Sequence, residues 1–142
     1  ISPDKSSLLV YSSFESKNMI STPIYKIDIA SGNPTKLTSE SFSQTPTYTP
    51  DGKHIVYMTG RDCDIFPFSV QGADWWIMNA DGSNQRRLTY MNQKDNAQSV
   101  NQYRLVGSLS FTSDTTFLGG IMVSPLGLHG NTVEVNFASF VK

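Results

Sequence analysis

The stretch SQTPTYTPDGKHIVYMTGRD, residues 43–62, places a tight-turn sequence between two runs that favour β-strands. In the turn PDGK, residues 50–53, proline presets φ, aspartate can accept a hydrogen bond from the backbone two residues on, and glycine takes a positive φ. Residues 45–49 before the turn are rich in β-branched and aromatic side chains, and residues 54–58 after it are mostly apolar. The stretch therefore predicts a β-hairpin.

The same pattern occurs more than once along the chain. The turn sequence SPDK at residues 2–5 precedes the apolar run 8–11, and Asp4 lies 47 residues before Asp51. A weaker third copy, FTSD at residues 111–114, precedes residues 116–118. A repeat with a period in the forties indicates an array of similar supersecondary units.

A second motif recurs out of phase with the first. Residues 24–28 lead through a Gly turn to KLT at 36–38, and residues 75–79 lead through DGSN to RLT at 87–89. Each unit is then strand, Pro-Asp turn, strand, loop, strand, Gly turn, strand, which is typical of a four-stranded β-propeller blade. We therefore predict an all-β fold of about three antiparallel blades, an incomplete propeller in one domain. Its units are 1–39, 44–90 and 105–142.

The strand compositions agree with stacked blades. Residues 55–58 and 75–78 are apolar without alternation, which predicts that both of their faces are covered. Trp75 and Trp76 are adjacent on one strand, so we expect one to pack on each side. The fourth strands, near 34–36 and 85–87, are polar and cationic, which suits an outer edge where charge discourages pairing. Three blades alone would leave two apolar faces in water.

The segments TPDGKHIVYMTGRD and DWWIMNADGSNQRRLT together resemble the repeat of the TolB-like, PD40 family of β-propellers. The match is strongest over residues 44–90, and residues 1–38 lack the first strand of the repeat. In the degraded unit 105–137, Ser113 replaces the expected proline and Thr115 the expected glycine, so its turn is expected to differ. The resemblance implies the C-terminal blades of a larger propeller, closed by a borrowed strand.

The blade topology also predicts where a partner would bind. The tight turns lie at one end of the strands, while the long segments 12–22, 59–73, 90–103 and 123–130 lie at the other. Long loops on a rigid scaffold commonly carry binding. The residues predicted to bind a partner are Asp62, Asp64, Phe66, Phe68, Tyr103, Arg104 and His129. Phe66 and Phe68 would be aromatic anchors, or would instead fill the space beneath their own loop.

Signatures of catalysis and of cofactor binding are missing from the sequence. Asp62 and Asp64 have the spacing of two calcium ligands, but the turn glycine and the closing glutamate are absent, so no metal is predicted. The single cysteine, Cys63, has no evident histidine partner, and no Gly-x-Ser-x-Gly elbow occurs. We therefore expect no enzyme activity and no cofactor.

The partners expected are proteins. The net charge of −1 argues against nucleic acid, and no apolar run is long enough to insert in a membrane. The family resemblance implies a non-catalytic protein-interaction scaffold of the bacterial envelope, in the periplasm or at the cell surface. The rest of the propeller, or another subunit completing the ring, is a further expected partner. The alternative is a substrate-gating propeller segment of a larger hydrolase or peptidase, whose catalytic domain would lie outside this chain.

Overall fold

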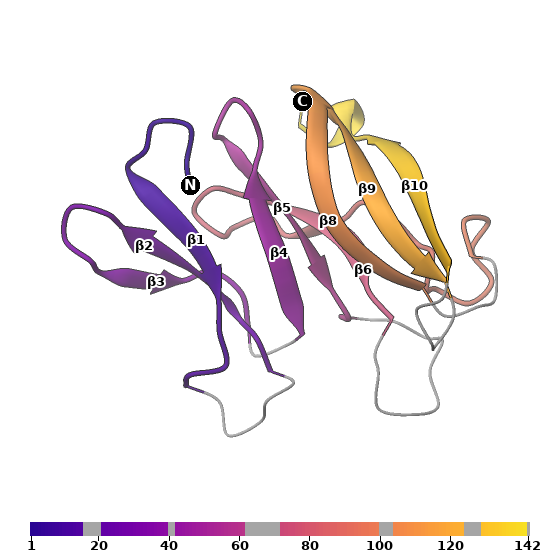
Figure 1. Ribbon diagram of the computed structural model, residues 1–142, viewed down its shortest axis with the longest axis horizontal. Coiled ribbons are helices and arrows are strands. Elements are labelled where there is room, and N and C mark those ends of the chain that lie inside the picture. The colour runs from indigo at the N-terminus through magenta and orange to yellow at the C-terminus, as the bar shows by residue number, and fades with distance from the viewer. Residues whose placement is uncertain (16–20, 40–41, 62–71, 100–103, 124–128, 142) are drawn as a thin grey trace.

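A computed structural model describes residues 1–15, 21–39, 42–61, 72–99, 104–123 and 129–141. These residues form three antiparallel β-sheets that lie side by side (Figure 1). The described ranges contain no α-helix, and one short 3-10 helix, η1 (Ala138–Phe140), follows the last strand. The predicted all-β fold is confirmed.

Each sheet is a simple meander in chain order. The first sheet holds β1 (Ser7–Tyr11), β2 (Ile24–Asp28) and β3 (Pro34–Lys36). The second sheet holds β4 (Ser43–Tyr48), β5 (His54–Thr59), β6 (Asp74–Asn79) and β7 (Arg86–Arg87). The third sheet holds β8 (Arg104–Ser113), β9 (Thr116–Val123) and β10 (His129–Asn136). Among the described residues, the first sheet therefore has no counterpart of β4 and the third has none of β7, which agrees with the incomplete blades that the sequence predicted.

The turn between β4 and β5 forms as its residues predict. The Asp51 carboxylate accepts hydrogen bonds from the Lys53 N–H at 3.1 Å and from the Thr49 hydroxyl at 2.6 Å. Gly52 has a φ of +71° and donates its N–H to the Thr49 carbonyl. The turn is thus closed by its own side chains and needs no support from elsewhere in the fold.

The turn before β1 repeats this geometry. The Asp4 carboxylate accepts the Ser6 N–H at 3.0 Å and the Ser2 hydroxyl at 2.6 Å. Lys5 stands at the position of Gly52 and adopts a φ of +61°, which is uncommon for a residue with a Cβ. The shared hydrogen bonds confirm that the two units repeat at the atomic level.

The third turn is different, as expected. Ser113 pairs directly with Thr116, so the connection between β8 and β9 shortens to Asp114 and Thr115. Without the proline of the other two copies, the chain reverses over two residues, whereas the five residues 49–53 separate β4 from β5.

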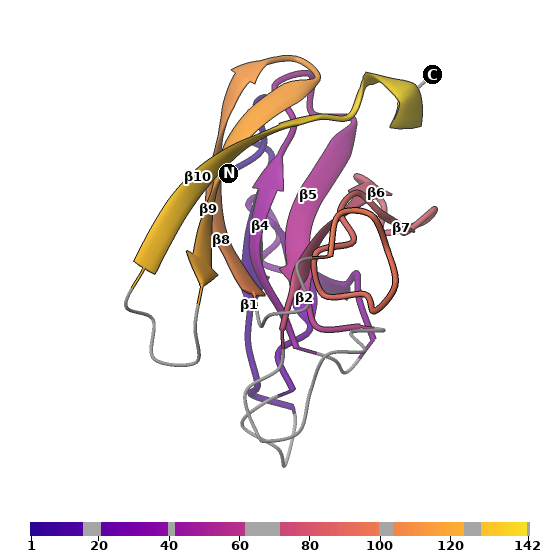
Figure 2. The ribbon, with the colours of Figure 1, turned by 90° about the vertical axis from the view of Figure 1, so that its right-hand side faces the viewer.

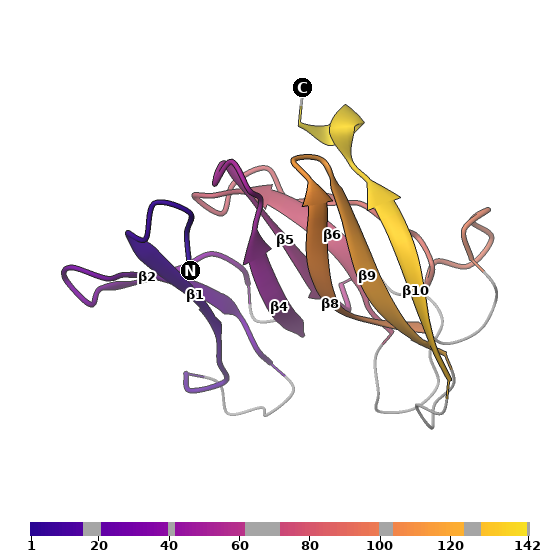
Figure 3. The ribbon, with the colours of Figure 1, turned by 45° about the horizontal axis from the view of Figure 1, so that its top comes forward.

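Two hydrophobic cores hold the three sheets together. The core between the first and second sheets includes Ile24, Leu37, Ile55, Tyr57, Trp76 and Met78. The core between the second and third sheets includes Val56, Trp75, Ile77, Leu88, Phe117 and Phe137. Figure 3 shows the second sheet between the other two. Trp75 and Trp76 therefore pack on opposite sides of β6, as predicted, and both faces of β5 and β6 are covered.

One expectation from the sequence is wrong for Arg87. Arg87 on the edge strand β7 is only 8% exposed, so its charge does not guard the edge against pairing in the way predicted. Both end sheets carry exposed apolar side chains on their outer faces. Leu8 on the first sheet is 39% exposed, and Leu118 and Met122 on the third sheet are 40% and 41% exposed. On the third sheet these lie beside polar residues such as Thr132 and Glu134.

Candidate site at the loop end of the sheets

The strands direct the long connections to one end of the molecule. Strands β1, β5 and β9 run downward in Figure 1, so the long connections that follow them begin at the lower end. The tight turns lie at the opposite end of these strands. Figure 2 shows the same separation from the side. This arrangement follows from the antiparallel meander, in which alternate connections share one end.

Most of the residues that the sequence predicted for partner binding fall in these connections. Asp62, Asp64, Phe66, Phe68 and Tyr103 lie outside the described residues, as does Cys63. Arg104 and His129 open β8 and β10, and both pair with Val123 of β9. The structure therefore brings the backbones of Arg104 and His129 to either side of one residue at the loop end of the third sheet. Their role in binding stays a prediction.

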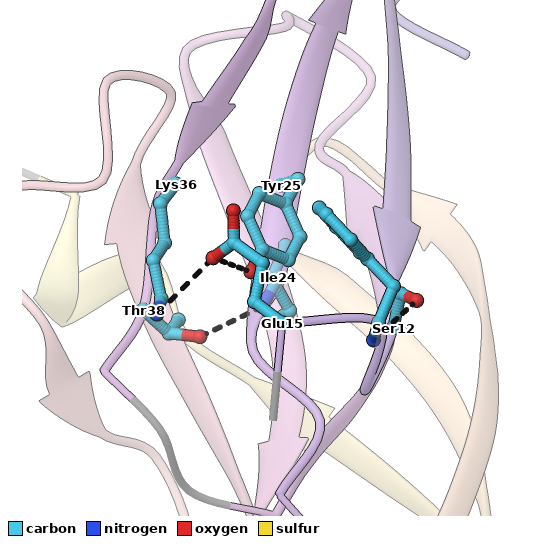
Figure 4. A network of polar contacts seen from close by, with 7 residues as sticks. Ser12, Glu15, Ile24, Tyr25, Lys36 and Thr38 are labelled. Carbon is cyan, nitrogen blue, oxygen red and sulfur yellow. Dashed lines mark hydrogen bonds and ion pairs between the residues drawn. The ribbon is translucent and has the colours of Figure 1, made fainter. Parts of the chain in front are cut away.

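The first sheet carries a network of polar contacts at this end, shown in Figure 4. The Tyr25 hydroxyl donates to the Glu15 carboxylate at 2.7 Å, and the Lys36 ammonium lies 3.8 Å from the same oxygen. The Lys36 ammonium also lies 6.0 Å from the centre of the Tyr25 ring. Phe14 also packs on Tyr25, with the two ring centres 5.2 Å apart. These contacts hold the first residues of the 12–22 connection against β2 and β3.

The second sheet repeats this arrangement with tryptophan in place of tyrosine and arginine in place of lysine. Trp76 and Arg87 pair across β6 and β7 as Tyr25 and Lys36 pair across β2 and β3. The Arg87 guanidinium lies 5.4 Å from the centre of the Trp76 ring, and the Arg61 guanidinium lies 5.2 Å from it. The indole is thus contacted by two guanidinium groups, a cation–π arrangement that gains strength as it is removed from water.

Hydrogen bonds fix the positions of both arginines. The Arg87 guanidinium donates to the Arg61 carbonyl at 2.8 Å and to the Gln93 side chain at 3.0 Å. The Thr59 hydroxyl accepts the Arg61 N–H at 3.2 Å, and the Ser12 hydroxyl accepts the Phe14 N–H at the same distance in the first sheet. The beginnings of the two loops are therefore built alike.

A buried carboxylate organises the connection after β7. Asp74 is fully buried and accepts hydrogen bonds from the Thr89 hydroxyl at 2.9 Å, the Met91 N–H at 2.8 Å and the Asn92 N–H at 3.2 Å. Burial raises the pKa of Asp74, while these three donors and the Arg87 charge oppose the rise. Asn92 is also fully buried and donates to the Ala73 carbonyl.

The described polar side chains at this end bind the backbone of the loops. The Asp74 carboxylate is occupied by three donors, and within the described ranges no group of three or more metal-ligating side chains is found. A polar cavity of about 260 Å³ lies at the opposite, tight-turn end, lined by Asp4, Lys26, Tyr48 and Asp51 among others. The described part of the chain also has no helix with the length and apolar character that a bilayer crossing requires.

Sequence reasoning missed Glu15, Asp74 and Asn92 as organising residues. Arg87 was noticed only as an edge cation. One sequence signal was available, because the second motif aligns Lys36 with Arg87 and Thr38 with Thr89. Thr38 and Thr89 make the same bond, accepting the N–H of Ile24 and of Trp75 respectively.

No family model matches the chain, and no curated protein matches it. Among solved structures, one assigned as TolB from Agrobacterium tumefaciens is 21% identical with a TM-score of 0.58. The match covers 95% of this chain and 48% of that one, so the chain spans about half its length. An oligogalacturonate lyase in complex with manganese is 16% identical with a TM-score of 0.44, over 79% of this chain and 30% of that one. The chain therefore has the fold of a TolB-like β-propeller, with incomplete blades at both ends.

Proposed function

We propose that this chain is part of a non-catalytic scaffold that binds a protein partner through the loop end of its sheets. The observation that supports this most is the contrast between the two ends. The turns at one end are closed by Asp4 and Asp51, whereas the four long connections all open at the other. A rigid framework that concentrates its variable segments at one end is a common design for binding.

The ordering of the loop bases also supports a binding role. The Arg61–Trp76–Arg87 stack and the buried Asp74 hold the beginnings of two connections in place. Ordering loops before binding lowers the entropy cost of forming a complex. Phe14, which is 66% exposed at this end, offers an aromatic anchor in the described part of the chain, beside the predicted anchors Phe66 and Phe68. Aromatic residues commonly dominate the binding energy of interfaces.

We further propose that the partner is met in the periplasm or at the cell surface, as for the family that the repeat resembles. Fractionation of cells that produce the protein, with antibodies against this chain, tests the compartment. Recovery only with the cytosolic fraction would contradict it.

Site-specific photocrosslinking tests the binding end. A photoreactive amino acid placed at Phe66 or Phe68 is expected to give a protein adduct in cells. The same amino acid at Ile29, in the turn after β2 at the other end, is expected to give none. Adducts formed from Ile29 alone would place the partner at the tight-turn end instead.

Substitution of the two phenylalanines separates binding from packing. The Phe66→Ser and Phe68→Ser variants are expected to lose the adduct at a neighbouring crosslinking position while keeping the melting temperature of the parent. A large fall in melting temperature with the adduct retained would show that these side chains pack the loop.

A further inference from the structure

The polar cavity at the tight-turn end lies between the turns that precede β1 and β5. The two turns approach each other closely there, since a Cβ on Gly52 would lie 3.3 Å from the ring of Pro3. The cavity has a volume of about 260 Å³, and its lining includes Asp4, Ser7 and Lys26 from the first sheet and its turn, and Tyr48, Asp51 and Ala80 from the second. It therefore belongs to the interface between the first two sheets.

The same place between the second and third sheets is filled by apolar side chains. By strand register and turn hydrogen bonds, the positions of Lys26, Tyr48 and Ala80 correspond to those of Ile77, Phe111 and Phe137. Ile77 and Phe137 are fully buried in the core there, and the ring centres of Phe111 and Phe137 lie 6.0 Å apart. The cavity is therefore not a gap that every interface of the repeat leaves open.

The groups that line the cavity have hydrogen-bonding capacity left over. The Lys26 ammonium donates to the Ala80 carbonyl at 3.3 Å, which uses one of its three N–H groups. Among the described residues, Asp51 accepts hydrogen bonds only through Oδ1, which leaves Oδ2 open.

A buried pair of hydroxyl groups adds a further donor. Ser7 and Tyr48 are only 7% and 8% exposed, and their hydroxyls share one hydrogen bond of 2.9 Å. That bond uses one of the two hydroxyl hydrogens, and neither hydroxyl makes another hydrogen bond within the described ranges. Buried donors without an acceptor are uncommon, so the second hydrogen indicates room for a polar ligand.

The lining carries more negative than positive charge. Hydrogen bonds from Ser2 and Ser6 lower the pKa of Asp4 to about 2. Burial raises the pKa of Asp51, but the hydrogen bonds from Thr49 and Lys53 lower it by more. Both carboxylates are therefore ionised at neutral pH, and together they outweigh the single ammonium of the lining.

We propose that this cavity binds a basic α-amino acid. The two cationic groups of such a ligand match the carboxylates of Asp4 and Asp51, and its carboxylate matches the Lys26 ammonium and the spare hydroxyl hydrogen. Its single net positive charge balances the excess negative charge of the lining, and guanidinium and carboxylate groups pair with good geometry. A metal ion fits less well, because this lining offers only two ligating carboxylates and adds a cation.

Calorimetric titration of the 142-residue chain with L-arginine tests the proposal, with agmatine, which lacks the carboxylate, as the comparison. We expect one saturable site for L-arginine and binding of agmatine that is weaker by about tenfold or more, since a hydrogen bond to a charged group contributes at least that much. Absence of a saturable site in the folded chain, or equal affinities for the two ligands, would overturn the proposal.

The Lys26→Met variant tests the carboxylate end of the site. It should weaken L-arginine by about tenfold or more and should not weaken agmatine, because it removes the partner of the carboxylate and one repulsive cation. The matched control is Lys53→Met, which removes a lysine of the same end that does not line the cavity and should leave both affinities unchanged. Equal losses of L-arginine binding in the two variants would contradict the assignment.

The Asp51→Asn variant tests the cationic end. It keeps an acceptor oxygen for the turn and removes the charge, so both ligands should bind more weakly while the melting temperature stays close to that of the parent. Unchanged binding of both ligands would rule Asp51 out as their partner. This measurement and the comparison of the two ligands on the parent decide the matter even if Lys26→Met does not fold.

The site lies at the end opposite to the long connections, so its outcome is independent of the partner binding proposed above.

Discussion

At the scale of single residues, Gly119 shows how closely the second and third sheets approach. A Cβ at Gly119 would lie 2.2 Å from Cζ2 and 2.4 Å from Cη2 of Trp75, which is fully buried. The indole is further held by a hydrogen bond from its N–H to the Gly107 carbonyl at 3.3 Å. The ring cannot move away without disturbing the core, so glycine is required at this position by packing.

The Gly119→Ala variant is therefore expected to lose about 1–3 kcal/mol of the free energy of unfolding, the usual range for overpacking a core. Gly120→Ala is the control, since its Cβ would meet only the Ser108 carbonyl at 3.9 Å. Urea unfolding measures both. A smaller loss for Gly119→Ala than for Gly120→Ala would contradict this account of the interface.

Asp4 makes the stability of its turn depend on pH. Hydrogen bonds from the Ser2 hydroxyl and from Ser6 lower the pKa of Asp4 to about 2. The folded pKa lies below that of the unfolded chain, near 3.9, so the stabilisation is complete above about pH 4 and is lost as the pH falls through about 2. We expect the melting temperature of the parent to fall more than that of Asp4→Ala between pH 5 and pH 2, about the window of that titration. Parallel melting curves for the two proteins across this range would rule the contribution out.

At the scale of elements, the strand pairs β2–β3 and β6–β7 each place a cation from the second strand over an aromatic ring of the first. Tyr25 with Lys36 and Trp76 with Arg87 occupy the same register positions in two sheets. The two pairs differ in burial, because Lys36 is partly exposed whereas Arg87 is covered by the connection after β7. The same repeated motif should therefore contribute unequally to stability.

We expect Arg87→Met to cost about 2–3 kcal/mol, because it removes charged donors from the partly buried hydrogen bonds to the Arg61 carbonyl and the Gln93 side chain. Lys36→Met, at the equivalent position, should cost at most about 1 kcal/mol, as is usual for exposed ion pairs. Because Arg87 opposes the rise in the pKa of Asp74, the Arg87→Met variant should also raise that pKa further. Denaturant unfolding and carboxylate titration by NMR check these effects, and equal costs for the two variants would show that burial is not what separates the pairs.

At the scale of the whole molecule, the three sheets form part of a ring with unlike ends. Among the described residues, the first sheet has no strand before β1, and the long strand β10 forms the edge of the third sheet. Both end sheets also expose apolar side chains, Leu8 on the first and Leu118 and Met122 on the third. Unpaired strand edges and open apolar faces both promote association.

The isolated 142-residue chain is therefore expected to associate weakly, with a light-scattering mass that rises with concentration. The Leu8→Lys variant should reduce this rise because it places a charge on the open face. A well-folded, cooperative monomer at every concentration would contradict the count of incomplete blades. The Leu118→Lys variant applies the same test to the outer face of the third sheet, where Leu118 and Met122 are exposed.

The sequence by itself determined the turns, the strand order and the repeated all-β units. These features depend on short-range chemistry, as when Asp51 bonds the backbone two residues on and Gly52 accepts a positive φ. The changed third turn was equally predictable, because Ser113 and Thr115 cannot supply the φ preferences of proline and glycine.

Only the tertiary structure decided which charged residues are buried and which faces are open. Arg87 looked like an edge cation in the sequence, but Trp76 and Tyr90 cover its guanidinium. Likewise, Glu15 gains its role by meeting Lys36 across another strand. The residues predicted for binding could be placed in loops but not assigned contacts. The physical reason is that burial and pairing depend on groups far apart in the chain, which short-range patterns do not encode.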